Sequence, residues 1–173
     1  MKKVGLYNEF RNKRMGDMKK RATFSAILSI GLLLSGCAQK ENDHAEEHQT
    51  NDIREETASI HRLPSFLAKH NESMAHLYEQ AANHQTLLEN IPCYCGCGES
   101  VDHKNNYDCF VYDNKSDGAI VWDDHATKCG VCLEIAAISI EQYEKGMSVK
   151  DIRRLIDETY KEGYAKPTPT KPM

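Results

Sequence analysis

The feature that most restricts this chain is the stretch Pro92–Gly98, which carries three cysteines at alternate positions. In an extended or gently turned backbone, residues i and i+2 point to the same side, so Cys93, Cys95 and Cys97 can present three sulfurs to one point. Cysteines this close in sequence are poor disulfide partners, because the bond requires a particular Cα separation and dihedral angle. They are good joint ligands for one soft metal ion.

Three more cysteines follow this stretch, at Cys109, Cys129 and Cys132. His125 stands four positions before Cys129 and seven before Cys132, a spacing that places all three on one face of a helix beginning near Ala126. Thiolates favour Cu(I) and Zn(II). A structural zinc needs four ligands, which would leave two thiols unexplained, so the excess favours Cu(I) with Zn(II) as the alternative. The predicted metal ligands are Cys93, Cys95, Cys97, Cys109, Cys129, Cys132 and His125, with His103 as a further candidate.

Two other interpretations of the thiols stay open. Disulfides could stabilise a small extracytoplasmic domain, with Cys109 bonded to one thiol of the alternating motif, although this leaves the crowding of the motif unexplained. Thiol–disulfide exchange is the other, with the pKa of Cys129 lowered at a helix N-terminus, although no βαβ pattern surrounds it. The sequence contains no nucleophile elbow, phosphate loop or HExxH motif, so we do not expect an enzyme.

The beginning of the chain predicts a lipoprotein signal peptide rather than folded structure. Basic residues at Lys19–Arg21 precede the apolar run Ala22–Leu34, which is shorter than the roughly 20 residues of a membrane-spanning helix. The run ends in Leu34–Cys37, which resembles the bacterial lipobox. That resemblance implies a diacylglycerol in thioether linkage on Cys37 and cleavage before it. A translation start at Met15 or Met18 fits such a peptide better than the upstream residues do.

The charge balance argues against nucleic acid as a partner. The chain has 22 basic and 26 acidic residues, of which eight basic and two acidic residues lie in residues 1–36. Residues 37–173 therefore hold 14 basic and 24 acidic residues, a net charge of −10. Nucleic acid and anionic lipid both require a basic face. We expect attachment to the outer face of the cell membrane through the lipid anchor. The sequence predicts neither the metal-transfer partner nor the oligomeric state.

Hydrophobic periodicity predicts a mainly α domain of four to five helices with a Cys-rich loop. Apolar stripes cover Met74–Ala82 and Leu133–Tyr143, and Ser148–Asp151 forms a capping box before another helix. The short apolar runs Cys109–Tyr112 and Ala119–Trp122 can pair as one β-hairpin. The expected organisation is a signal peptide over residues 1–36, a lipidated cysteine and disordered spacer over 37–59, the helical domain over 60–163 and a disordered tail over 164–173.

The hexapeptide Pro92–Cys97 is similar to the motif of the PCYCGC-motif lipoproteins of Gram-positive bacteria. The resemblance covers about 100 residues and includes Asp108–Val111, Trp122-Asp123, and His125 followed by Cys129–Cys132. It implies a small, mainly helical protein anchored on the outer face of a Gram-positive-type membrane. It implies no activity and does not identify the metal.

Overall fold

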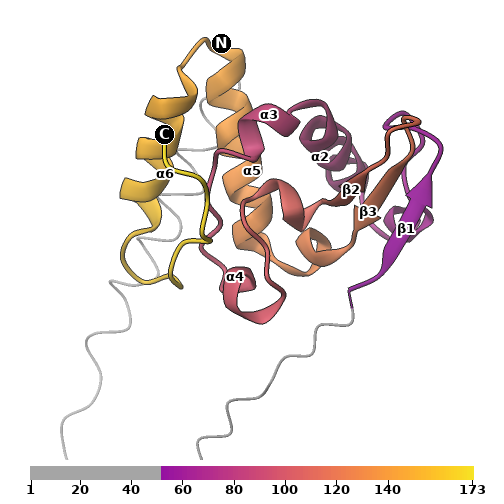
Figure 1. The fold of residues 1–173 in the computed structure, drawn as a ribbon, viewed down its shortest axis with the longest axis horizontal. Helices are drawn as coiled ribbons and strands as arrows, with labels where there is room; N and C mark the ends of the chain where they lie inside the picture. The colour runs from indigo at the N-terminus through magenta and orange to yellow at the C-terminus, as the bar shows by residue number, and fades with distance from the viewer. Residues whose placement is uncertain (1–51) are drawn as a thin grey trace, which may run out of the picture. The chain divides into compact units, whose positions relative to one another are not determined.

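The computed structural model describes residues 52–173, which form a mixed α/β fold (Figure 1). This corrects the prediction of a mainly α domain, because a three-stranded antiparallel sheet in the order β1-β3-β2 accompanies the helices. The strands are β1 (Arg54–Thr57), β2 (Val111–Asn114) and β3 (Ile120–Asp123). The α-helices are α2 (Glu72–Asn83), α3 (Gln85–Leu88), α4 (Cys97–Ser100), α5 (Gly130–Glu144) and α6 (Val149–Tyr160). The 3-10 helices are η1 (Ser65–Lys69), η2 (Tyr107–Cys109) and η3 (His125–Lys128).

Strands β2 and β3 form the hairpin that the two apolar runs predicted. The loop between them closes with a hydrogen bond of 2.8 Å from the Lys115 N–H to the Ala119 carbonyl. Gly118 in this loop has φ of +92°, a conformation that favours glycine. The pairing shifts register between Val111 and Asp113, and such a bulge adds local twist to a strand.

Strand β1 comes from residues that we expected in the disordered spacer, so the spacer prediction is wrong for Arg54–Thr57. These four residues pair with β3 from Asp123 to Ile120. Strand pairing satisfies backbone groups whatever the side chains are, so a polar segment can add to an existing edge. Within β1 only Thr57 is buried, and its hydroxyl accepts a hydrogen bond of 2.8 Å from the indole of Trp122. The apolar surface is therefore supplied by β3.

The sheet packs on α2 through buried aromatic side chains. The ring of Tyr78 in α2 lies 5.0 Å from the ring of Phe110 and 6.2 Å from that of Trp122, measured between centroids. The Tyr78 hydroxyl donates a hydrogen bond of 2.9 Å to the Asp123 carbonyl at the end of β3. All three rings are fully buried. This contact fixes the end of β3, from which the chain continues toward the cysteines.

Helix α5 runs through the centre of the fold, against α2, α3 and α6 (Figure 1). It begins at Gly130 and not near Ala126, because Cys129 has an extended backbone and separates α5 from η3. A glycine inside a helix costs about 1 kcal/mol, which favours a helix that starts at Gly130 over one that runs through it. The prediction that His125, Cys129 and Cys132 share one helical face is therefore wrong.

The structure confirms the predicted N-terminal cap of the last helix, α6. The Asp151 N–H donates a hydrogen bond of 3.2 Å to the Ser148 hydroxyl at the start of α6. After α6, the tail 164–173 contains no helix or strand but contacts the PCYCGC loop, as described below. No helix within residues 52–173 is long and apolar enough to cross a membrane. The predicted signal peptide, the lipidation site Cys37 and most of the spacer lie outside the described residues.

Candidate metal centre

The PCYCGC loop lies between α3 and α4 and brings its three sulfurs together. The sulfurs of Cys93, Cys95 and Cys97 all lie within 4.8 Å of one another. Gly96 has φ of +92° and precedes the first residue of α4, so the motif requires its glycine at this turn. Cys93 and Cys97 are buried, whereas Cys95 is partly exposed. The alternating pattern thus produces the shared sulfur group that it predicted.

Cys132 forms a compact triangle of sulfurs with two of the motif cysteines, Cys93 and Cys95. The Sγ atom of Cys132, in the first turn of α5, lies 3.5 Å from that of Cys93 and 3.4 Å from that of Cys95. Cys93 and Cys95 are themselves 3.4 Å apart. We call Cys93, Cys95 and Cys132 the sulfur trio. Its members come from positions up to 39 residues apart, so the trio is a product of the tertiary fold.

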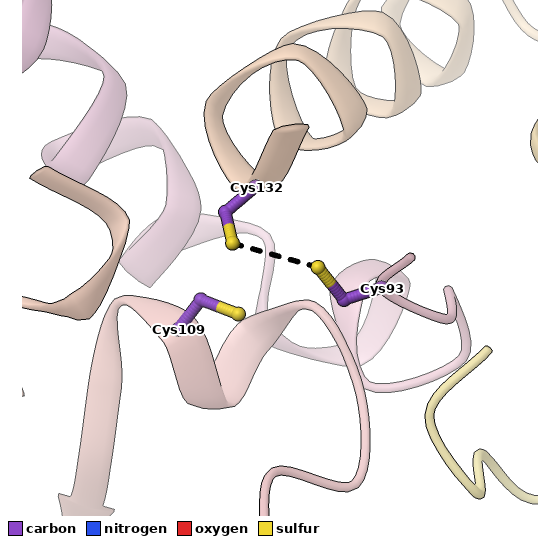
Figure 2. A group of neighbouring side chains, drawn as sticks. All are labelled: Cys93, Cys109 and Cys132. Atoms are coloured by element: carbon purple, nitrogen blue, oxygen red, sulfur yellow. Dashed lines mark hydrogen bonds between the residues drawn. The ribbon is translucent and has the colours of Figure 1, made fainter. Parts of the chain in front are cut away.

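Cys109 extends the group from a third direction. Figure 2 shows its side chain, from η2, turned toward those of Cys93 and Cys132. The three sulfurs lie within 4.8 Å of one another, and Cys109 also lies 3.8 Å from Cys97. The six cysteines of the described region are all free thiols. Five of them, Cys93, Cys95, Cys97, Cys109 and Cys132, therefore form one continuous sulfur cluster that is buried except at Cys95.

Asn106 joins the two halves of this cluster. Its backbone N–H donates a hydrogen bond of 2.8 Å to the Ile91 carbonyl, just before the PCYCGC loop. Its side-chain amide donates one of 3.2 Å to the carbonyl of Cys132. Asn106 is fully buried, so both bonds are shielded from water. This residue holds the loop against the start of α5.

The tail fixes the other side of the loop. The Cys93 N–H donates a hydrogen bond of 3.0 Å to the Thr168 hydroxyl, and the Thr168 N–H donates one of 2.9 Å to the Cys93 carbonyl. The Ala165 N–H donates to the Tyr94 carbonyl. A Cβ on Gly98 would lie 3.3 Å from the Thr168 backbone, so the glycine permits this close approach. The C-terminal tail thus holds the backbone of the motif on one side, and Asn106 anchors the residue before it.

His125 lies beside the trio with its ring fixed by a carboxylate. Its Nε2 atom is 4.0 Å from the sulfur of Cys95, and its Nδ1 atom is 3.0 Å from Oδ2 of Asp52. Burial disfavours the charged ring, but the hydrogen bonds with Cys95 and Asp52 outweigh burial and raise the pKa of His125 to about 9. A carboxylate on Nδ1 leaves Nε2 as the metal-binding nitrogen, the usual support for a histidine ligand.

The thiols share charge unequally. Hydrogen bonds from Cys109 and Cys132 lower the pKa of Cys93 to about 4, and hydrogen bonds from Cys109 and Cys129 lower the pKa of Cys95. Burial raises the pKa of Cys109. The cluster therefore favours negative charge on Cys95, whose sulfur accepts hydrogen bonds from the thiols of Cys93 and Cys132. A thiolate is the form that binds metal.

Cys129 has a different position from the other five cysteines. It lines a surface pocket together with Cys95, Cys97 and His125, and it is partly exposed. The hydrogen bond from Cys132 lowers its pKa, but the contact with Cys95 and burial outweigh that effect and raise it. This corrects the lowered pKa that thiol–disulfide exchange would require of Cys129. Cys95 and Cys129 instead form the solvent-facing side of the cluster.

His103, which the sequence offered only as a further candidate ligand, is buried next to the cluster. Its ring lies 4.8 Å from that of His125, and it offers a nitrogen within 4.8 Å of the Cys97 sulfur. Burial and the nearby His125 lower its pKa. Both ring nitrogens lack a hydrogen-bond partner.

Nothing in the sequence marks Asp52, Asn106 or Thr168 as parts of the site. Asp52 lay in a polar segment that composition assigned to the spacer, and Thr168 lay in the expected tail. Each acts through a contact with a residue more than 25 positions away, and no local pattern marks such contacts. An aspartate near a histidine ligand can be anticipated in kind, but its position cannot.

The trio is close to the dimensions of a thiolate metal site. Sulfurs bound to one ion at about 2.3 Å are separated by roughly 3.8–4.0 Å. The trio at 3.4–3.5 Å must therefore open by only about 0.3–0.6 Å to accept an ion. The arrangement can hold a thiophilic ion within three sulfurs, with His125 and Cys109 adjacent.

A comparison with protein families agrees with the motif. The family described as "Protein of unknown function with PCYCGC motif" matches residues 26–173. No curated protein and no solved structure matches the chain. Because the match covers most of the sequence, the chain belongs to this PCYCGC-motif family, as its hexapeptide and its downstream cysteines indicated.

Proposed function

We propose that this protein binds a soft metal ion, most readily Cu(I), in its cysteine cluster and so buffers, sequesters or delivers that ion outside the cytoplasm. The observation that carries the proposal is the trio, in which three sulfurs from two distant segments lie 3.4–3.5 Å apart. Bringing thiols together in the interior without disulfides has an evident use when they share one ion.

Several features favour Cu(I) over Zn(II). Cu(I) is a soft ion and thiolates are its preferred protein ligands. Zinc requires a tetrahedral set, which here would be drawn from the trio with His125 or Cys109. The cluster holds more sulfurs than one zinc ion uses, and Cu(I) can distribute over such an excess. Zn(II) is the alternative cargo for the same residues.

The surface pocket supplies a route for the ion. Cys95 and Cys129 are partly exposed, whereas Cys93 and Cys132 are buried. An incoming ion would meet Cys95 first, since its lowered pKa keeps it as a thiolate. It would then exchange ligands inward to Cys93 and Cys132. A transfer partner would receive the ion by the reverse path, which makes the role one of binding and not of catalysis.

The signal-peptide features support a position on the outer face of the cell membrane. The lipobox resemblance at Leu34–Cys37 supports a lipid anchor on Cys37, and two acyl chains hold a protein firmly at a bilayer. The acidic balance of the remaining chain suits capture of cations and not adhesion to anionic lipid. The protein would thus bind metal that arrives from outside the cell.

An anaerobic Cu(I) titration of the reduced protein against a chromophoric chelator tests the proposal. We expect at least one tightly bound equivalent and thiolate-to-copper absorption in the near ultraviolet. Cys132→Ser should weaken binding by more than the 10- to 100-fold typical of losing a supporting residue. Val131→Ala is the matched control, because Val131 precedes Cys132 in the first turn of α5 and offers no ligand atom, so its effect should be small.

A count of free thiols distinguishes metal binding from the disulfide interpretation. Thiols are counted on protein secreted into an oxidising compartment, before and after reduction. Six free or metal-protected thiols besides Cys37 agree with the proposal. Two or three bridges, together with no Cu(I) uptake by the native protein, would replace it with a structural role.

A further inference from the structure

The buried ring of His103 has no function in the sulfur trio. The residue is 5% exposed, and both Nδ1 and Nε2 are buried without a hydrogen-bond partner. Asp52 and Asp123 each have a carboxylate oxygen within 4.8 Å of a His103 nitrogen, yet neither forms a hydrogen bond with it. A buried polar group without a partner is costly, and an ion is one of the explanations for such a group in a native protein.

The residues around His103 form a second set of metal ligands. The sulfur of Cys97 and one nitrogen each from His103 and His125 lie within 4.8 Å of one another, and all three residues are buried. None of the pairwise contacts of the sulfur trio involves Cys97 or His103. Cys109, with its sulfur 3.8 Å from that of Cys97, can supply a fourth ligand. The second set thus differs from the trio in position and in chemistry.

We propose that Cys97, His103 and His125 form a second metal subsite, which takes a borderline divalent ion such as Zn(II) beside the soft ion held by the trio. Two imidazoles and a thiolate, completed by a further thiolate, are a donor set that zinc accepts in tetrahedral geometry. Three sulfurs alone suit Cu(I) better. The proposal deepens the proposed function, since it assigns a second ion to the same cluster.

The His125 ring is prepared for this role by its neighbour. The Asp52 carboxylate lies on Nδ1 and leaves Nε2 as the ligand atom. His103 has no comparable support, so either of its nitrogens can turn toward the ion. The ring of His103 packs against that of His125 with an interplanar angle of 72°. The edge-to-face contact places both rings beside Cys97.

The test uses the full reduced chain under anaerobic conditions and Co(II) as a coloured substitute for Zn(II). One equivalent of Cu(I) is added first, and Co(II) is then titrated. We expect one equivalent of Co(II) to bind with the visible bands of a tetrahedral ion and a thiolate-to-cobalt charge-transfer band. His103→Phe keeps the ring packing but removes the ligand. It should weaken Co(II) binding at least tenfold and leave Cu(I) binding unchanged.

His76→Phe is the matched control, because His76 is exposed on α2 and far from any cysteine contact. It should leave both titrations unchanged. A melting curve of the metal-free protein separates a ligand from a structural residue. His103→Phe removes an unpartnered polar group, so its melting temperature should equal or exceed that of the wild type. A clear fall in melting temperature would assign His103 a structural role and overturn the inference.

A measurement on the wild type makes the test independent of the variant. Nitrogen-15 spectra of the histidine rings are recorded as Zn(II) is added to the Cu(I)-loaded protein. The resonances of both His103 and His125 should shift, and an unchanged His103 would overturn the subsite. If Cu(I) binds and no Co(II) follows, the subsite fails while the proposed function stands. If Co(II) binds through His103 and Cu(I) does not bind, the subsite stands and the copper proposal fails.

Discussion

Oδ2 of Asp52 lies 3.0 Å from Nδ1 of His125, although 73 positions separate the two residues in the sequence. The carboxylate is almost fully buried at its side chain and also contacts the Lys128 ammonium at 3.1 Å. Burial opposes its charge, but the hydrogen bonds from His125 and Lys128 outweigh burial and lower its pKa. Asp52 therefore stays ionised and orients the imidazole.

We predict that Asp52→Asn weakens Zn(II) binding about 10- to 100-fold, the usual effect of losing the carboxylate behind a histidine ligand. The amide cannot supply the negative charge that holds the ring and raises its basicity. Competition with a zinc chelator measures the change. Asp113→Asn is the control, since Asp113 forms an ion pair with Lys115 on the hairpin and has no contact with the cluster. Equal affinities for Asp52→Asn and wild type would remove Asp52 from the site.

The second prediction concerns the glycine inside the motif. Gly96 has φ of +92°, whereas a Cβ at this position would meet only the Ala165 Cβ at an ordinary 3.7 Å. Gly96→Ala should lower the free energy of unfolding by about 1–2 kcal/mol through backbone strain alone. Gly130→Ala should be neutral or slightly stabilising, because Gly130 does not have a positive φ and a Cβ added there would meet no atom within 4 Å. Urea unfolding of both variants provides the comparison, and equal effects would contradict it.

The third prediction concerns the contact between the tail and the loop. Thr168→Val removes the hydroxyl that accepts from the buried Cys93 N–H, at a cost of about 1–3 kcal/mol in unfolding free energy. Loosening this contact should also speed the reaction of Cys93 with a thiol reagent. Thr159→Val is the control, because its exposed hydroxyl bonds only within α6, to the Leu155 carbonyl. If both variants react and unfold alike, the tail does not hold the loop.

The fourth prediction concerns the membrane anchor. Cys37→Ala removes the thiol on which the lipid is expected, so the protein should move from the membrane fraction to the medium. Cell fractionation and the intact mass of the purified protein measure this, with Cys132→Ser as the control that should stay in the membrane fraction. Cys37→Ala protein that remains membrane-bound would speak against a lipid anchor at this position.

Local sequence patterns predicted the parts of this protein that depend on neighbouring residues. Ser148 caps α6 as its pattern indicated, because its hydroxyl accepts a hydrogen bond from the Asp151 N–H. The alternating cysteines of the PCYCGC loop share one side of the backbone. Capping and side-chain direction follow from a few consecutive residues, so the sequence suffices for them.

Two other local predictions were wrong, one where a distant strand offered an edge and one where a glycine divided a helix. Composition placed Arg54–Thr57 in a disordered spacer, but β3 offers these residues a strand edge. Periodicity placed His125 and Cys132 on one helix face, but the break at Cys129 divides that helix. For Arg54–Thr57, backbone hydrogen bonds to a distant strand outweigh a weak local preference. At Cys129, the cost of a glycine inside a helix favours a new start at Gly130.

Short stretches of sequence were enough to identify the dense set of thiols, the lipobox-like N-terminal pattern and the amphipathic helices, because each of these depends on residues close together in the chain. The contact of Cys132 with Cys93 and Cys95, the support of His125 by Asp52 and the burial of His103 without a hydrogen-bond partner became evident from the folded protein alone. The physical reason is that such contacts depend on how helices and strands pack, and packing joins residues that no sequence spacing relates.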